Sequence, residues 1–305
     1  VHRGLAEEFH AAVAEIDKEI VGMAFGEVRW VQYAGQEVPG VYISHLRVHP
    51  DHRGHGIASE LSDWALEYIT DLLRPDAVLY GAVMAGNVSM KLADRYGFKP
   101  TKPIQGGILP IRNSPPNPIP DLEVRVAERK ELPVIAEGMN AFYREHNLWI
   151  PVSVDTLEDF LKQEVDEVKP NQLYVAVRGD EVVAGLSLSD RTKLVRMRLA
   201  RAPWYVRTLG NWLGLLPASG VLDALTVRRV WFREGELEAA RYLWDTLRYD
   251  LREQGNCLGI AYDPRDKLAD VFRVPFWLPM FKARYLVRAS DPLEAERPIY
   301  CIAGP

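Results

Sequence analysis

Residues 41–58 read VYISHLRVHPDHRGHGIA, and this stretch decides the fold of the chain. Apolar and polar residues alternate over 41–48, as in a half-buried strand, and the run after residue 58 has the apolar spacing of a helix. The turn between them, at 53–56, is Arg-Gly-His-Gly. Glycines at such a turn let the backbone approach a ligand, and a helix N-terminus attracts negative charge. The pattern therefore predicts an anion site, most naturally for a pyrophosphate.

The longer string over residues 48–58 is V-x-P-x-x-R-G-x-G-x-A. It lacks the Lys-Ser/Thr of a P-loop and the third glycine of a dinucleotide-binding turn. It resembles the GNAT family, the acyl-CoA-dependent N-acetyltransferases, whose signature is Arg/Gln-x-x-Gly-x-Gly/Ala after a strand that ends in Val-x-Pro. The alternative is a Gly-rich strand-to-helix turn that binds nothing.

The resemblance implies that acetyl-CoA binds at this turn as a cosubstrate. The contacts that it implies lie at the end of the strand, in the turn and at a later helix: Leu46, Arg47, Val48, Arg53, Gly54, His55, Gly56, Ile57, Ala58 and Asn87. Backbone N–H groups at 46–48 would donate hydrogen bonds to the pantetheine arm and to the oxyanion of the tetrahedral intermediate. Asn87 stands one residue after the family's asparagine position, which falls on Gly86.

The resemblance further implies direct attack of a primary amine on the thioester, which needs a base for the amine or a water path and an acid for the departing thiolate. Strand alternation places Tyr42 and Ser44 on the face shared by residues 46 and 48. His45 has a suitable unperturbed pKa, about 6.5, but points to the other face unless a β-bulge re-aims it. These three are the candidates on the strand. Neither Tyr42 nor Ser44 is a carboxylate, and a packed or surface histidine is the alternative for His45.

The fourth catalytic candidate is Tyr96. The family's frequent tyrosine, which protonates the departing thiolate, falls on Ala93 of this chain, and Tyr96 is the nearest phenol. Three residues further along a helix, it lies well round the axis from residue 93. An aromatic residue packed at the end of the helix is the alternative.

The chain has 305 residues, about twice the length of a typical domain. Four prolines within 113–120 predict an extended linker, which divides the chain into modules at 1–112 and 121–305. The segments Leu-Arg-Val at 46–48 and Leu-Thr-Val at 225–227 align with an offset of 225 − 46 = 179, and Lys-Leu-Ala-Asp recurs at 91 and 267 with an offset of 267 − 91 = 176. Nearly equal offsets indicate an internal repeat.

The predicted fold is therefore α/β (α+β), with two tandem GNAT-like modules that are each a twisted mixed sheet flanked by helices. The first module is expected to have strands at 9–16, 19–31, 41–48 and 77–84 and helices at 59–73 and 87–98. The second is expected to have strands at 122–127, 173–177, 182–188, 222–230 and 257–262 and helices within 131–147, 154–167 and 236–254.

The second module is expected not to bind the cofactor. An offset of 179 places Phe232 at the position of Arg53 and keeps only Gly235 of the glycines, while Glu234 and Glu236 would repel a pyrophosphate. We therefore expect the first module to be catalytic and the second to be structural or to shape the substrate site.

The hairpin glycine of the second module, Gly185, follows the start of that module's first strand by 63 residues, since 185 − 122 = 63, whereas only 21 residues precede its counterpart, Gly22. The first module is thus expected to lack its N-terminal strand and helices. Either the given chain lacks this strand and these helices, or the first module is shortened and the second module covers its sheet in their place.

Composition describes a globular protein, with 48% hydrophobic residues and a formal net charge of −5. It disfavours bulk nucleic-acid binding, and no apolar run is long enough to span a bilayer. Two cysteines suggest a reducing cytoplasm. No metal is expected, because the spacing of the three histidines near the turn, His49, His52 and His55, on a phosphate-binding loop favours contact with the cofactor or with solvent.

An insertion at 191–216 interleaves basic and aromatic residues, which would suit a membrane surface or nucleic acid, although a solvated excursion is favoured. The order of a motif-bearing module, a Pro-rich joint and a second module with this insertion is also loosely similar to plant Hookless-type N-acetyltransferases.

The expected partners are acetyl-CoA or CoA and an amine acceptor of unknown identity, and the chain is expected to be a pseudo-dimeric monomer or a homodimer. The predicted activity is that of an N-acetyltransferase, an acyltransferase that transfers groups other than aminoacyl groups. The alternative is a non-catalytic acyl-CoA-binding or protein-interaction module.

Overall fold

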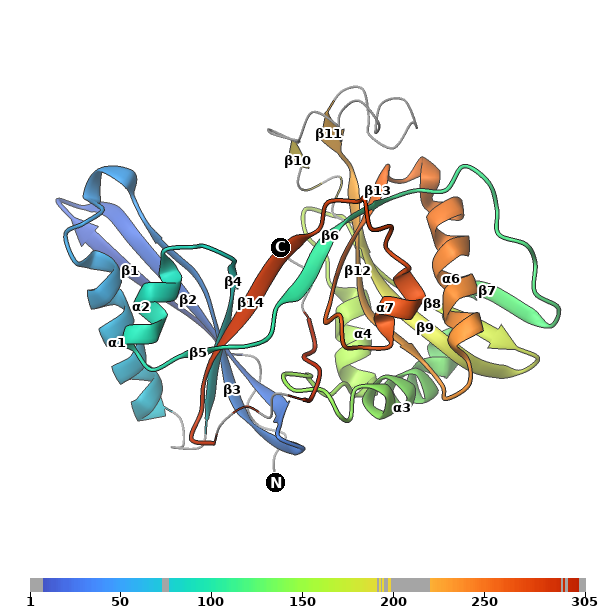
Figure 1. Ribbon diagram of the computed structural model, residues 1–305, viewed down its shortest axis with the longest axis horizontal. Coiled ribbons are helices and arrows are strands. Elements are labelled where there is room, and N and C mark those ends of the chain that lie inside the picture. Colours follow the sequence, from blue (N-terminus) through green and yellow to red (C-terminus); the bar gives the residue numbers. More distant parts are fainter. Residues whose placement is uncertain are drawn as a thin grey trace. The chain divides into compact units, whose positions relative to one another are not determined.

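The computed structural model describes residues 8–72, 77–190, 192, 194, 197–198, 220–291, 293 and 296–301, so most of the basic insertion at 191–216 lies outside the described residues. The chain forms two compact units (Figure 1). Unit 1 comprises Val1–Pro103, His146–Pro151 and Lys282–Pro298, and unit 2 comprises Ile104–Glu145, Val152–Phe281 and Ile299–Pro305. Among the described helices, none combines the length and the apolar character that a membrane-spanning segment needs.

Unit 1 is a mixed sheet with the strand order β1-β2-β3-β4-β14, in which β5 also pairs with β14. The first three strands form an antiparallel meander, β4 is parallel to β3, and β14 is antiparallel to β4. The elements are β1 (Glu8–Ile16), β2 (Glu19–Tyr33), β3 (Gln36–Val48), η1 (Pro50–His52), α1 (Ile57–Leu72), β4 (Val78–Met84), α2 (Ser89–Arg95), β5 (Lys99–Pro100) and β14 (Phe281–Arg288).

The position of α1 on the sheet of unit 1 depends on a glycine in β2. A Cβ atom at Gly22 would lie 3.0 Å from side-chain atoms of both Ile57 and Leu61, so only glycine lets the helix approach this closely. These two α1 residues are buried together with Ala12 and Val21. This packing fixes the N-terminus of α1 beside the end of the motif strand.

Within the described part of unit 1, both helices pack on the same face of the sheet. Leu66 of α1 and Ala93 of α2 contact one cluster of buried residues that also contains Val28 and Val41. On the first strand, Phe9 is 59% exposed and Val13 is 55% exposed.

Unit 2 has the strand order β6-β13-β12-β9-β8-β7. Its two central hairpin strands are buried along nearly their whole length, because helices cover both faces. The elements are β6 (Ile104–Pro110), β7 (Leu122–Val126), η2 (Arg129–Glu131), α3 (Leu132–Phe142), α4 (Val154–Lys162), β8 (Asn171–Arg178), β9 (Glu181–Asp190), β10 (Met197–Arg198), β11 (Val221–Leu222), β12 (Ala224–Phe232), α6 (Leu237–Asp250), η3 (Leu251–Glu253), β13 (Cys257–Tyr262) and α7 (Leu268–Phe272). The short strands β10 and β11 form a separate antiparallel pair.

The predicted α/β class and the predicted helices and strands are confirmed, with ends that differ by a few residues. The repeat is visible in the order of elements, since β3-α1-β4-α2 is followed later in the chain by β12-α6-β13-α7. Each series ends in one further strand, and these two strands are exchanged: β14 pairs with β4 and β6 pairs with β13. The predicted division at 113–120 follows the sequence repeat, whereas each compact unit includes a strand from the other half of the chain.

The predicted offset of 179 is wrong within the motif strand. Both motif strands contain a β-bulge, at His45 with φ 54° in β3 and at Arg229 with φ 52° in β12, and 229 − 45 = 184. The last residue of β12, Phe232, therefore corresponds to Val48 and not to Arg53. The offset returns to 179 at the turn, where Gly56 and Gly235 both have positive φ before a helix.

Candidate functional site

The glycine turn of the first module joins η1 to α1. Gly54 has φ 84° and Gly56 has φ 88°, a region that residues with a side chain rarely adopt. A Cβ atom at Gly54 would meet nothing within 4 Å. The glycine is therefore required by the backbone conformation and not by crowding.

This backbone conformation leaves a series of donors without partners. The N–H of Arg53 donates to the Pro50 carbonyl at 3.3 Å, and the N–H of Ser59 donates to the Gly56 carbonyl at 2.8 Å. For the N–H groups of residues 54–58, no acceptor is found within the described chain. Because these groups lie at the positive end of the α1 dipole, they form a concentrated site for an anion.

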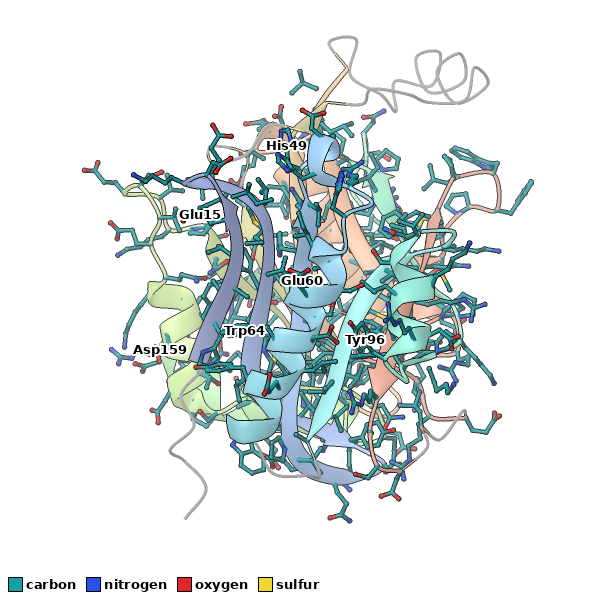
Figure 2. The ribbon with its side chains drawn as sticks, turned by 90° about the vertical axis from the view of Figure 1, so that its left-hand side faces the viewer. Glu15, His49, Glu60, Trp64, Tyr96 and Asp159 are labelled. Carbon is teal, nitrogen blue, oxygen red and sulfur yellow. The ribbon has the colours of Figure 1, made fainter. Side chains whose placement is uncertain are left out.

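The Arg53 side chain holds the turn against the end of the motif strand. Its Nε donates to the Val48 carbonyl at 3.1 Å, while the side chain as a whole is exposed. No carboxylate of the described residues pairs with this guanidinium, so its terminal nitrogens remain available to a ligand. Figure 2 shows His49 near the beginning of α1 and Glu60 in the first turn of the helix, where both side chains are exposed.

The motif strand is only partly paired with its parallel neighbour. The β3–β4 ladder covers Gly40 to Tyr42 on one side and Val78 to Tyr80 on the other, although β3 continues to residue 48. Beyond this ladder a Cβ atom at Gly81 would lie 2.6 Å from the Ile43 carbonyl oxygen. Gly81 thus lies against the Ile43 carbonyl. Because the ladder ends at Tyr42, the edge of residues 43–48 that faces β4 makes no ladder hydrogen bonds to β4, and beyond the Ile43 carbonyl it can offer backbone groups to an extended ligand arm.

The bulge changes which side chains of β3 share a face. Four residues pack into the clusters on the helix-covered face: Val41, Ile43, Leu46 and Val48. The prediction that Tyr42 and Ser44 share that face is wrong, because the extra residue at the bulge reverses the alternation. Leu46 and Val48 contribute apolar packing, and Arg47 beside them is exposed.

His45 lies at the bulge itself. It is exposed, its Nδ1 lies 3.0 Å from the Ser44 hydroxyl, and its ring centroid lies 5.2 Å from that of Phe25. The bulge that would be needed to re-aim this histidine is therefore present. Of the three histidines near the turn, His49 and His52 have ring centroids 5.8 Å apart. Among the described residues no group of three His, Cys, Asp or Glu is placed to hold a metal ion.

Tyr42 lies among polar and aromatic residues that sequence reasoning missed. Its ring centroid is 5.4 Å from that of Tyr80, and the Arg29 guanidinium carbon lies 6.0 Å from the ring. Arg29 also pairs with the carboxylate of Glu27. The alternation along β2 is the sequence signal that places Glu27 and Arg29 on one face. The contact between Tyr42 and Tyr80 depends on the parallel pairing of β3 with β4, which residue spacing in the sequence does not reveal.

Tyr96 connects α2 to the beginning of α1 (Figure 2). Its hydroxyl lies 2.8 Å from Asp63 Oδ1 and 3.0 Å from the Ser59 carbonyl oxygen, both of which it can reach as a donor. Burial, and then the hydrogen bond and charge of Asp63, raise the pKa of Tyr96. The phenol therefore remains protonated at neutral pH.

The remaining predicted cofactor contacts lie near this turn or on α2. His55 is exposed, Ile57 is buried in the cluster that anchors α1, and the Ala58 carbonyl accepts a hydrogen bond from the Ser62 hydroxyl at 2.7 Å. Asn87 is exposed, and its Oδ1 accepts from the Ser89 N–H at 2.9 Å. The structure thus gives Asn87 a local role at the beginning of α2.

The corresponding cleft of the second module is filled by its own chain. The ladder between β12 and β13 covers Ala224 to Thr226 and Cys257 to Gly259, and the strands separate beyond it. Tyr143 and residues 299–301 line the space between them and leave a cavity of only ≈ 10 Å³. The Tyr143 hydroxyl donates to the Val230 carbonyl at 2.6 Å. There is no room for a cofactor arm.

Comparison with known proteins agrees with this geometry. The chain is similar in structure to a GCN5-related N-acetyltransferase from Anabaena variabilis, with TM-score 0.55, 14% identity and coverage of 92% of this chain and 63% of that one. A GCN5-related N-acetyltransferase from Kribbella flavida gives TM-score 0.54, 14% identity and coverage of 92% and 60%. Saccharomyces cerevisiae N-myristoyltransferase gives TM-score 0.60, 9% identity and coverage of 94% and 74%.

The chain thus spans 60–63% of the length of the two bacterial structures, and at these identities the likeness concerns the fold. No curated protein matches the chain in sequence. Residues 2–98, which include the glycine turn and the motif strand, match the sequence model of the acetyltransferase (GNAT) family. The similarity in sequence to the GNAT family therefore concerns the first module, about a third of the chain.

Proposed function

We propose that this protein is an N-acyltransferase whose first module binds an acyl-CoA and transfers the acyl group to an amine. The observation that carries the proposal is the series of unpaired N–H groups at residues 54–58, at the N-terminus of α1. The match of residues 2–98 to the GNAT family model and the fold shared with N-acetyl- and N-myristoyltransferases support acyl transfer.

Acetyl-CoA is the proposed donor and a primary amine the proposed acceptor. The pyrophosphate would lie on the glycine turn, with the Arg53 guanidinium as its charged partner. The pantetheine arm would run along the unpaired edge of residues 43–48 and bring the thioester to the bulge at His45. Backbone N–H groups on that edge would then stabilise the oxyanion.

In the proposed reaction the amine lone pair attacks the thioester carbonyl, and the tetrahedral intermediate collapses by breaking the C–S bond. The amine loses one proton and the CoA thiolate gains one. His45 is the proposed proton acceptor, directly or through water, because it is exposed at the bulge. Tyr96 is protonated and is the proposed acid, although its hydroxyl is held by Asp63 and Ser59.

The second module is proposed to support the first without binding a cofactor, because Tyr143 and residues 299–301 fill its cleft. One acyl-CoA per chain is therefore expected. The proposed location is the cytoplasm, which agrees with two buried cysteines, Cys257 and Cys301, that form no disulfide. In solution the chain is proposed to be a pseudo-dimeric monomer or a homodimer.

Arg53→Ala tests the proposal, with Lys91→Ala, an exposed α2 residue, as the matched control. We expect Arg53→Ala to weaken CoA binding at least about tenfold, since charge-assisted hydrogen bonds contribute about 1.5–3 kcal/mol, whereas the control should bind as the unmodified chain does. Calorimetric titration with CoA measures this effect. Equal affinity in all three proteins would show that the turn is not the CoA site.

Thiol release from acetyl-CoA in the presence of a panel of amines tests turnover separately. Release that depends on one class of amine would identify the acceptor. CoA binding without amine-dependent release would favour the second candidate, a non-catalytic acyl-CoA-binding module. That candidate is supported by the lack of a carboxylate on the motif strand between residues 38 and 48.

A further inference from the structure

Unit 2 contains a pocket that the acyl-transfer proposal does not use. Its volume is about 500 Å³, and it is formed by the end of β6, the linker, α6 and the end of α7. The lining residues are Arg112, Pro116, Asn117, Asp245, Arg248, Phe272 and Arg273. This volume is within the usual range for sites that bind small molecules.

Three arginines of the pocket converge on one carboxylate. Asp245 Oδ2 lies 2.6 Å from Arg273 Nη2 and 3.2 Å from Arg112 Nη1, and Asp245 Oδ1 lies 3.5 Å from Arg248 Nη1. No other carboxylate of the described residues forms an ion pair with these three guanidinium groups. Three positive charges and one negative charge leave the pocket with a surplus of two positive charges.

The cluster is held in place by the backbone around it. Arg248 donates from Nε and Nη2 to the Pro110 carbonyl at 3.0 and 2.9 Å, and the Arg112 N–H donates to the Arg248 carbonyl at 2.9 Å. Arg112 Nε also donates to the Ser114 carbonyl at 3.3 Å. The Arg248 and Asp245 side chains are only 17% and 11% exposed. The site is therefore built before any ligand arrives.

Repulsion among the surplus positive charges destabilises the protein when no ligand is bound. Burial lowers the pKa of Arg248, and although Asp245 opposes this effect, the charges of Arg112 and Arg273 add to it. A cluster that served only to join β6, α6 and α7 would need one arginine for its one aspartate. A dianion would relieve the repulsion, and guanidinium groups match the geometry of phosphate oxygens.

We infer that this pocket binds a small molecule through a dianionic phosphate monoester, with the phosphate between Arg112, Arg248 and Arg273. The Asp245 carboxylate positions the three guanidinium groups and takes up one of their charges. Asn117 lies at the rim of the same pocket and offers an amide to the remainder of the ligand. The volume of about 500 Å³ leaves room for that remainder beyond the phosphate.

The test is calorimetric titration of the full chain with inorganic phosphate and with ribose 5-phosphate, at constant ionic strength in chloride. We expect both to bind in a saturable manner, and ribose 5-phosphate to bind more tightly because it fills more of the pocket. Arg273→Gln should weaken both at least about tenfold, since a charge-assisted hydrogen bond is lost. Arg273 has φ 46°, and glutamine meets the same backbone cost, so this strain is unchanged.

Arg252→Gln is the matched control, because Arg252 belongs to η3 in the same unit and its side chain is 36% exposed. It should bind phosphate as the unmodified chain does. Asp245→Asn should change phosphate affinity in the opposite sense. Because it removes the one negative charge of the cluster, the folded fraction of this variant should bind phosphate severalfold more tightly. Its folded fraction is followed by circular dichroism in the same samples.

Three outcomes would overturn the inference: no saturable phosphate binding by the unmodified chain up to 10 mM, equal affinities for Arg273→Gln and Arg252→Gln, or weaker binding by folded Asp245→Asn. Each would assign the cluster a structural role only. CoA titration of the same variants separates this site from the glycine turn, because Arg273→Gln should leave CoA affinity unchanged.

Discussion

The two modules use the same bulged strand and the same following helix, but they connect the two elements differently. Eight residues separate β3 from α1, since 57 − 48 − 1 = 8, and four separate β12 from α6, since 237 − 232 − 1 = 4. Both connections end near a glycine of positive φ, 88° at Gly56 and 83° at Gly235. The longer connection carries Arg53 and a second glycine, Gly54.

The modules differ again at the point where the parallel strands separate. In the second module this space is occupied by Tyr143 and residues 299–301, which are buried parts of unit 2. The two modules thus share a fold and differ at the proposed cofactor site. Under the proposed function, cofactor binding depends on four additional residues in one connection and on which side chains enter the cleft between the strands.

The largest expected effect comes from emptying the filled cleft. Tyr143→Ala should lower the free energy of unfolding by about 3–5 kcal/mol, as do other truncations of buried aromatic residues. Tyr143→Phe keeps the ring and loses the hydrogen bond to the Val230 carbonyl, so it should cost about 1 kcal/mol. Urea unfolding followed by circular dichroism measures both.

A loss below about 1 kcal/mol for Tyr143→Ala would contradict the view that this residue fills the cleft for stability. CoA titration of the same variant sharpens the comparison. We expect one equivalent per chain, because Arg233 of the short connection pairs with Glu181, and Glu234 and Glu236 beside it would repel a pyrophosphate. Binding of a second equivalent of CoA would show that the filled cleft alone prevents the second module from binding CoA.

A smaller effect is expected from a matched pair of glycine substitutions. Gly56→Ala and Gly235→Ala both place a side chain at positive φ in open surroundings, so each should lower the free energy of unfolding by about 1–2 kcal/mol. Only Gly56→Ala should weaken CoA binding, about tenfold, because it disturbs the unpaired N–H groups of the turn. Calorimetric titration with CoA compares them, and equal CoA affinities would remove the distinction between the two turns.

Sequence periodicity was sufficient for the local elements and for the glycine turn, since these depend on residues that are close in the chain. It did not reveal β6 and β14, whose partners are strands from the other half of the repeat. It also did not reveal the bulge at His45, because a non-glycine residue with positive φ has no local signature, and the face predicted for Tyr42 was therefore wrong.

Long-range packing explains the rest of what the sequence did not show. Tyr143 and Tyr300 meet with ring centroids 5.1 Å apart, although 157 residues separate them, since 300 − 143 = 157. No spacing rule connects such positions. The cluster around Asp245 likewise collects Arg112 after β6, Arg248 of α6 and Arg273 after α7, which become neighbours only in the folded unit.

The smallest expected effect concerns Tyr96, which the second module replaces with Phe272, since the offset of 176 at this helix gives 96 + 176 = 272. Because the pKa of Tyr96 is raised in the folded protein, its stabilising contribution is complete below the unfolded pKa of about 10 and is lost as the pH rises through the folded pKa. Tyr96→Phe should therefore cost about 1 kcal/mol at neutral pH, and the difference from the unmodified chain should shrink above pH 10. Unfolding in urea at pH 7 and at pH 10.5 measures both differences.

Turnover by Tyr96→Phe then separates the two roles open to this phenol. If Tyr96 protonates the departing thiolate, kcat should fall at neutral pH while CoA affinity is kept, because the hydroxyl would be needed only after the acyl group has moved. If it only joins α2 to α1 through Asp63, kcat should be unchanged and Asp63→Asn should remove the part of the raised pKa that comes from the carboxylate charge. A fall in kcat for Tyr96→Phe but not for Asp63→Asn would place the chemistry on the phenol itself. The absence of this hydroxyl from the second module would then support the proposal that only the first module catalyses transfer.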